Sequence, residues 1–278
     1  MISQLTGAFV RAILVMVLIA MPSLMLTAVP HDTTQIVALV AIFAAALTFF
    51  EYASTYPGLV EFRDAPPFNR MRFLSLFATV LFLSAIVRGT TTPTTLTIFV
   101  EALGNRIGEV IDVPYSPVRL VVLMLPDDMS LEHLLLVRTT AGISYLISLL
   151  TLVVFVGTMR AIGWPNRIGT FNVWINLPTF DPTTGGDVVD RLQRDARFNI
   201  ALGFLLPFLI PAAVKVASLA FTPVTLESPQ TLIWTMTAWA FLPASLLMRG
   251  IAMGRVAGMI AEKRKMNHIA AEAEMVPA

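Results

Sequence analysis

The chain has 278 residues, of which 56% are apolar and only 13% are charged, and its formal net charge is +1. Soluble domains carry about 25% charged residues, so this composition excludes a protein surrounded by water and predicts one embedded in a lipid bilayer. The small net charge predicts no nucleic-acid partner. Cysteine is absent, which excludes disulfides, thiolate metal sites and lipid or haem attached to cysteine.

Histidine is scarce as well. The three histidines, His31, His133 and His268, all lie outside the long apolar runs. A helical bundle that holds haem inside a membrane needs histidine ligands within its spans. The sequence therefore predicts no bound cofactor.

Six apolar stretches are long enough for a transmembrane helix, which needs about 20 residues. The predicted spans are 9–29, 34–54, 71–90, 136–161, 198–222 and 229–249. The first stretch has an alternative as a cleaved signal peptide, but its long apolar run and the lack of a small-residue cleavage site favour a retained helix. We expect an all-α integral membrane protein, with a single transmembrane domain over residues 1–265 and a cytoplasmic tail over residues 266–278.

The distribution of basic residues predicts the orientation. Lysine and arginine favour the cytoplasmic side of short loops. They follow the second, fourth and sixth spans, whereas the loops after the first and fifth spans contain none. The loop after the third span is less clear, because its arginines are offset by acids. This pattern predicts a protein of the bacterial inner membrane with both chain ends in the cytoplasm.

The segment 91–135 is predicted to lie on the extracytoplasmic side and to contain a surface helix. Its apolar residues recur at helical spacing, with polar residues largely on the other side. These apolar residues are Leu96, Phe99, Val100, Leu103, Ile107, Val110 and Ile111. We expect an amphipathic helix over 95–111 along the outer surface. The run 118–125 is too short to span and is interpreted as interfacial or re-entrant.

Acidic residues precede the fourth span. Asp127, Asp128 and Ser130 are typical of a helix N-terminus, where a side-chain oxygen caps the helix and negative charge is favourable. The alternative is a divalent-metal site formed by Asp128, Glu132 and His133. The sequence favours the cap over the metal site.

Two loops on the predicted cytoplasmic side are rich in aromatic residues and proline. They cover residues 55–70 and 162–197, and a short helix is expected to begin near Asp187. Flexible linkers are instead rich in glycine and serine, so both loops are predicted to be ordered. The sequence leaves open whether they only cover the bundle or form a docking surface for another subunit.

Two features of the last two spans suggest specific roles. Lys215 lies inside the fifth span, after Pro207 and Pro211, which remove hydrogen-bond donors and free carbonyls, as in some transporter sites. The alternative, which the sequence favours, is that Lys215 extends to the outer interface. The sixth helix is expected to continue past Arg249 into the cytoplasm, where a stripe of Gly250, Gly254 and Gly258 allows close helix packing, against this chain or a second protein.

No catalytic motif is present, including metalloprotease and nucleophile-elbow patterns. The leading hypothesis is a non-catalytic accessory or assembly subunit of a larger inner-membrane complex, whose partners are the lipid bilayer and other membrane protein subunits. The alternatives are a small-solute or ion transporter or channel that uses Lys215 with the Pro207/Pro211 helix, and a membrane-embedded enzyme that acts on lipid.

Overall fold

The computed structural model describes residues 2–27, 30–165, 171–181, 183 and 185–275, and this part of the chain forms nine helices and no strand. The helices are α1 (Ile2–Met25), α2 (His31–Ala53), α3 (Phe68–Gly89), α4 (Thr95–Ile111), α5 (Pro117–Met124), α6 (Leu131–Ala161), α7 (Val173–Asn176), α8 (Val188–Ala217) and α9 (Pro229–Met275). Six of them, α1, α2, α3, α6, α8 and α9, are long and apolar enough to cross a membrane. This confirms the all-α class and the six long apolar helices.

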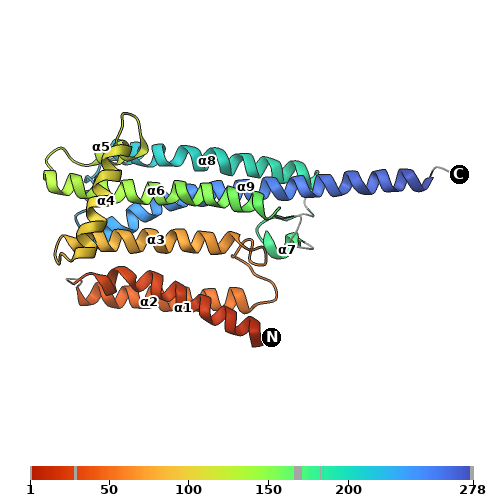
Figure 1. The fold of residues 1–278 in the computed structure, drawn as a ribbon, viewed down its shortest axis with the longest axis horizontal. Helices are drawn as coiled ribbons and strands as arrows, with labels where there is room; N and C mark the ends of the chain where they lie inside the picture. Colours follow the sequence, from red (N-terminus) through yellow and green to blue (C-terminus); the bar gives the residue numbers. More distant parts are fainter. Residues whose placement is uncertain (1, 28–29, 166–170, 182, 184, 276–278) are drawn as a thin grey trace.

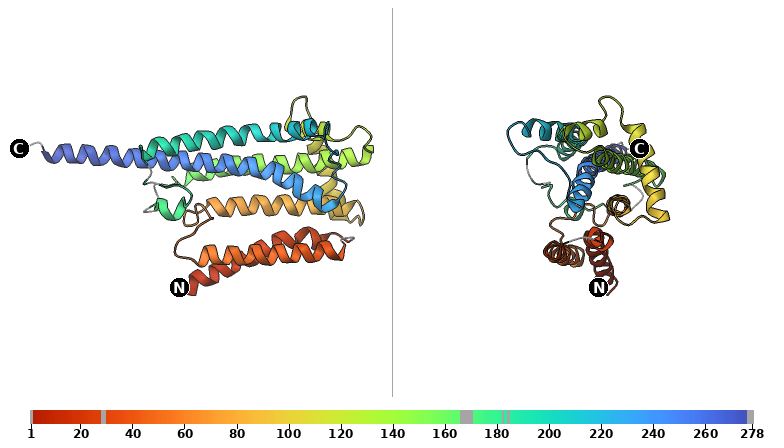
Figure 2. Two further views of the ribbon diagram at one scale, coloured as in Figure 1. Left: turned by 180° about the vertical axis from the view of Figure 1, so that it is seen from behind. Right: turned by 90° about the vertical axis from the view of Figure 1, so that its left-hand side faces the viewer.

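The six long helices run side by side along one axis, whereas α4 crosses them near one end (Figures 1 and 2). The other end carries the start of α1 and the long C-terminal part of α9, which projects beyond the bundle. We call these the α4 end and the terminal end. The first and the last described residues, Ile2 and Met275, therefore both lie at the terminal end of the bundle.

Several helix bounds differ from the predicted spans. The fifth span was predicted to end at residue 222, but α8 ends at Ala217. Pro223 disfavours the helical conformation of the residue before it, and the Ser218 hydroxyl donates to the carbonyl of Lys215 at 2.7 Å. The helices α1, α2, α3, α6 and α8 also begin before the predicted spans, and α9 continues past residue 249 to Met275, as expected. Hydropathy locates the part of a helix that lies in lipid, and not the polar turns that extend it.

The first two helices form a hairpin at the side of the bundle (Figure 2). Among the described helices, α2 contacts only α1, and the hairpin joins the bundle mainly through the contact of α1 with α3. Ala8 and Ala12 of α1 are buried, as are Ala41 and Ala45 of α2. Small residues four apart let two helix backbones approach closely. These alanines therefore explain why α1 and α2 pack mainly against each other.

The crossing of α4 over α6 also depends on small residues. A Cβ atom added to Gly142 of α6 would lie 2.6 Å from the Cα atom of Gly108 in α4. The buried side of α4 therefore carries small side chains, while Phe99 and Val110 are exposed. The helix predicted over 95–111 is present, but its large apolar residues largely face away from the protein, as they would if lipid covered them.

Buried side chains form two clusters. One lies toward the α4 end and includes Val80, Leu83 and Met236. The other lies toward the terminal end and includes Phe62, Phe155 and Leu192. The second cluster is completed by residues from the loops between helices, and these loops form the candidate site.

Candidate functional site

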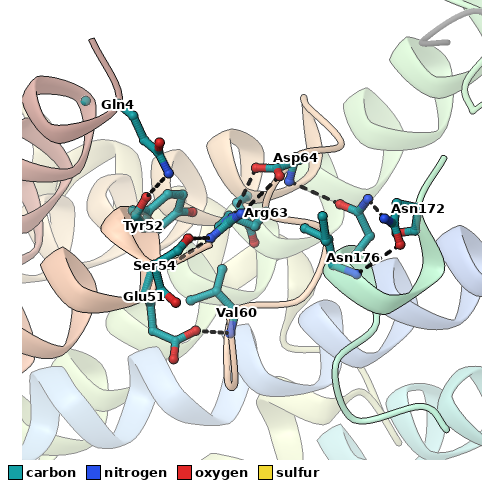
Figure 3. Close-up of polar contacts among 12 residues, drawn as sticks. Gln4, Glu51, Tyr52, Ser54, Val60, Arg63, Asp64, Asn172 and Asn176 are labelled. Carbon is teal, nitrogen blue, oxygen red and sulfur yellow. Dashed lines mark hydrogen bonds and ion pairs between the residues drawn. The ribbon is translucent and has the colours of Figure 1, made fainter. Parts of the chain in front are cut away.

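Two loops close the terminal end of the bundle, and together we call them the loop cap, defined as residues 54–67 and 171–181. The backbone N–H of Phe62 donates to the carbonyl of Asn176 at 2.7 Å. The N–H of Asp64 donates to Asn176 Oδ1 at 3.1 Å (Figure 3). Asn176 is buried, so these bonds join loops that are more than a hundred residues apart in sequence.

Arg63 fixes the first loop to the end of α2. Its Nη1 donates to the carbonyls of Glu51 at 3.0 Å and Ser54 at 2.6 Å, and its Nε lies 3.1 Å from Asp64 Oδ1 (Figure 3). The last carbonyls of a helix have no partner within the helix. The Arg63 guanidinium supplies one, so the loop and the helix end are held as one unit.

The carboxylate of Glu51, near the end of α2, also holds the first loop. Its carboxylate accepts the backbone N–H groups of Gly58, Leu59 and Val60 at 2.9–3.2 Å. The sequence places Glu51 within the second predicted span and indicates no contact for it. The turn that brings Gly58 back to the helix end is what makes the contact possible.

A bidentate ion pair joins the loop cap to α9. Arg249 Nε lies 2.6 Å from Glu61 Oε2, and Arg249 Nη2 lies 2.8 Å from Glu61 Oε1. The Thr179 hydroxyl donates to Glu61 Oε1 at 2.7 Å. Burial alone would raise the pKa of Glu61, but the hydrogen bonds from Arg249 and Thr179, with the positive charge of Arg249, lower the pKa below its ordinary value. The carboxylate is therefore held in its charged form.

Phe62 is the hydrophobic anchor of the cap. It is completely buried, with ring centroids 4.4 Å from Phe68 and 5.9 Å from Trp164. Its φ is 52°, in a region that bulky residues rarely occupy, and such a conformation persists only where the surroundings enforce it. The aromatic packing around Phe62 supplies that enforcement and joins the first loop to the bundle.

The outer surface of the cap exposes large apolar side chains. Tyr56 is 79% exposed, Leu59 is 69% exposed and Trp174 is 58% exposed. Tyr56 and Leu59 lie on the first loop, and Trp174 lies in α7 on the second. Exposed aromatic residues are typical of the anchors of protein interfaces.

Lys215, the predicted transport residue, lies at the end of a helix and not in its middle. Lys215 is in the last turn of α8, and its side chain is 45% exposed. Its Nζ donates to the carbonyl of Leu125 at 3.3 Å and lies 3.8 Å from Asp127 Oδ1. This geometry fits the interfacial alternative, in which the lysine ties the end of α8 to the segment after α5.

A side chain of α9 donates a hydrogen bond to a carbonyl that the proline pair leaves without its helical donor. Pro211 has no N–H to donate to the carbonyl of Pro207. The indole N–H of Trp239 donates to that carbonyl instead, at 3.1 Å. The Pro207 carbonyl is therefore engaged by the protein.

The acidic segment before α6 caps a helix. The N-cap is Ser130, whose hydroxyl accepts the N–H of His133 at 3.2 Å. His133 Nε2 lies 2.8 Å from the carbonyl of Thr225. Among the described residues, no three His, Cys, Asp or Glu side chains are grouped to hold a metal, and Asp128, Glu132 and His133 form no such group. An open pocket of about 270 Å³ nearby is lined by residues that include Glu101, Glu132 and His133.

The three glycines of the stripe differ in their surroundings. A Cβ atom added to Gly250 would lie 2.7 Å from the carbonyl oxygen of Ala196 in α8, whereas at Gly254 it would lie 3.8 Å from the Ala196 side chain. At Gly258 it would meet nothing within 4 Å. Close packing at Gly250 is thus made within this chain.

No protein-family model matches this sequence, and no curated protein or solved structure shows significant similarity to it.

Proposed function

We propose that this chain is a non-catalytic accessory or assembly subunit of a larger complex in the bacterial inner membrane, and that the loop cap is its docking surface. The observation that carries the proposal is the combination of a cap held by side-chain hydrogen bonds and the exposed Tyr56, Leu59 and Trp174 on it. A loop that served only to cover the bundle would not need these side chains on its outer side, because exposed aromatic residues contribute little to stability.

The C-terminal part of α9 supports the same proposal. Residues 261–272 are exposed throughout, and they include Met266 and Ile269 at 63% and 50%. Near its start this segment is held by the ion pair between Arg264 Nη1 and Asp187 Oδ2 at 2.6 Å. A partner packed along Met266 and Ile269 would bury these exposed apolar side chains, which is favourable in water.

The proposed orientation has both chain ends in the cytoplasm. Of the 19 basic residues, Arg167 lies outside the described part of the chain, five lie toward the α4 end, and the other thirteen lie toward the terminal end or on the projecting part of α9. The five are Arg88, Arg106, Arg119, Arg138 and Lys215. The terminal end is therefore the cytoplasmic side under the positive-inside rule, and the loop cap then faces the cytoplasm.

Transport through Lys215 is the weaker proposal. The lysine is at the interface and already has a carbonyl and a carboxylate nearby. The carbonyl freed by Pro211 is bonded to Trp239. The lipid-acting enzyme remains an alternative without a specific observation that favours it.

The test compares complexes extracted from native membranes in mild detergent, with their mass measured by native mass spectrometry. The wild type is expected in a complex with a second protein in fixed ratio, and replacing Tyr56, Leu59 and Trp174 together by serine should release it. The control replaces Val113, Tyr115 and Leu131, which lie toward the α4 end and are 51%, 89% and 71% exposed, and should keep the complex. A monomer in all three preparations would contradict the proposal.

A further inference from the structure

Arg72 is a positive charge in an aromatic setting near the terminal end of α3. It is the fifth residue of that helix, which corresponds to a rise of about 6 Å from the helix start. Its guanidinium carbon lies 5.5 Å from the ring centroid of Phe68 and 6.0 Å from that of Phe241 in α9. The two rings hold the cation near one face of α3, and they offer it no acceptor for a hydrogen bond.

The guanidinium has unused donors. Arg72 Nε is buried and has no hydrogen-bond partner, and within the described residues no hydrogen bond or ion pair to Arg72 is formed by its terminal nitrogens. The carboxylate that acts on Arg72 is that of Glu61, but both oxygens of Glu61 are already bonded, to Arg249 and Thr179. The Glu61–Arg249 pair is neutral as a unit, so the charge of Arg72 is left without a counterion.

A second positively charged side chain, that of Arg11, belongs to the same region. The guanidinium carbon of Arg11 in α1 lies 4.7 Å from the ring centroid of Tyr52 in α2, and both Arg11 and Arg72 act electrostatically on Tyr52. Within the part of the chain that the structure describes, Arg11 donates only to the carbonyl of Gly7 in its own helix. The junction of the hairpin with α3 therefore carries two positive charges, and no carboxylate among the described residues bonds to either of them.

We propose that Arg72 binds a phosphate group, carried by the headgroup of a membrane lipid in the leaflet at the terminal end. Phosphate oxygens accept two parallel hydrogen bonds from the planar guanidinium fork, which matches the unused donors. Arg72 lies less than two helical turns from the start of α3, the depth at which a transmembrane helix meets the headgroup layer. Basic sites between helices on the cytoplasmic side commonly hold anionic headgroups. The lipid site does not depend on the docking proposal.

The experiment uses the full chain, stripped of lipid in detergent, and measures its thermal unfolding temperature and its binding of three added ligands. These are phosphatidylglycerol, diacylglycerol, which lacks the phosphate, and inorganic phosphate. Phosphatidylglycerol should stabilise the wild type. Arg72→Gln should weaken its binding about tenfold or more, as expected for the loss of a charged hydrogen bond. The effect of diacylglycerol on the unfolding temperature should be the same in the wild type and in Arg72→Gln.

The matched control is Arg70→Gln, which removes the same charge two residues earlier from an exposed side chain and should bind phosphatidylglycerol as the wild type does. Arg72→Lys keeps the charge without the fork, and should bind with intermediate affinity; it also serves if Arg72→Gln does not fold. Equal binding by the wild type and both Arg72 variants would overturn the site. Millimolar inorganic phosphate is the last comparison. If it raises the unfolding temperature as much as phosphatidylglycerol does, and the rise depends on Arg72, then the ligand is a soluble phosphate and not a lipid headgroup.

Discussion

The indole N–H of Trp239 in α9 donates to the carbonyl of Pro207 in α8, at 3.1 Å. This is the carbonyl that Pro211, four residues later, leaves without its helical donor. In a lipid environment such a group has no water to bond, so the indole completes the hydrogen bonding of the neighbouring helix. Trp239 also stacks on Tyr145 of α6 at a centroid distance of 5.8 Å, which fixes its ring between three helices.

Trp239→Phe should therefore destabilise the protein. The change keeps an aromatic ring in a site that is 4% exposed, but it removes the donor and leaves a buried carbonyl unpaired, at a cost of about 1–3 kcal/mol. Thermal unfolding in detergent measures the effect. Trp174→Phe, at a 58% exposed position, is the control and should leave the unfolding temperature unchanged. A Trp239→Phe protein as stable as the wild type would mean that the Pro207 carbonyl is satisfied in another way.

The same pair of residues marks the limit of prediction from sequence. The prolines indicate that α8 has free carbonyls, but nothing local to Pro207 indicates that a residue 32 positions later covers one of them. Lys215 is similar, because its role depends on where α8 ends. Once the helix ends at Ala217, the lysine is in the last turn and its interfacial position follows.

Arg249 and Glu61 form the main ion pair between α9 and the loop cap, and their side chains are 27% and 12% exposed. Replacing one partner leaves the other charge poorly compensated, so Glu61→Gln and Arg249→Gln should each lower the free energy of unfolding by about 2 kcal/mol or more. The double variant should lose less than the sum of the two, with an interaction energy of about 1–3 kcal/mol. Unfolding in denaturant measures all four proteins, and strict additivity would show that the pair is not coupled.

The pH dependence of stability follows from the pKa of Glu61, which is lower in the folded protein than in the unfolded chain. For such a carboxyl group the stabilisation is fully present above the unfolded-state pKa, which is about 4.3 for glutamate. It is lost as the pH falls through the lower folded-state pKa. The wild type should therefore lose stability below about pH 4 more steeply than Glu61→Gln. Parallel stability curves for the two proteins between about pH 6 and about pH 3 would contradict the assignment.

The six apolar helices are predictable from sequence because hydropathy is a local property, and each span carries its own signal. The loop cap is not, because its contacts join residues far apart in the chain: Glu61 and Arg249 are separated by 188 positions. The aromatic and proline content of the loops predicts that they are ordered, and Phe62 of the first loop does pack against Phe68. The partners of each side chain depend on tertiary structure, which composition does not encode.

The glycine stripe on α9 gives an internal control for helix packing. At Gly250 an added Cβ atom would lie 2.7 Å from the Ala196 carbonyl oxygen and 3.1 Å from the Ile200 backbone nitrogen, so two backbones would have to separate. At Gly258 the space is open. Gly250→Ala should therefore destabilise the protein by about 1–3 kcal/mol, a typical cost of overpacking. Gly258→Ala should raise its stability by about 0.5–1 kcal/mol, because alanine favours the helix.

Both effects are read from thermal unfolding of the purified chain in detergent, and the opposite signs make the comparison informative. If Gly258→Ala also disrupts a complex isolated from native membranes while the isolated chain is stabilised, then the open glycine faces a second protein. If both variants are stabilised, α8 and α9 approach each other less closely at Ala196 than a 2.7 Å contact requires, and the close packing assigned to Gly250 is wrong.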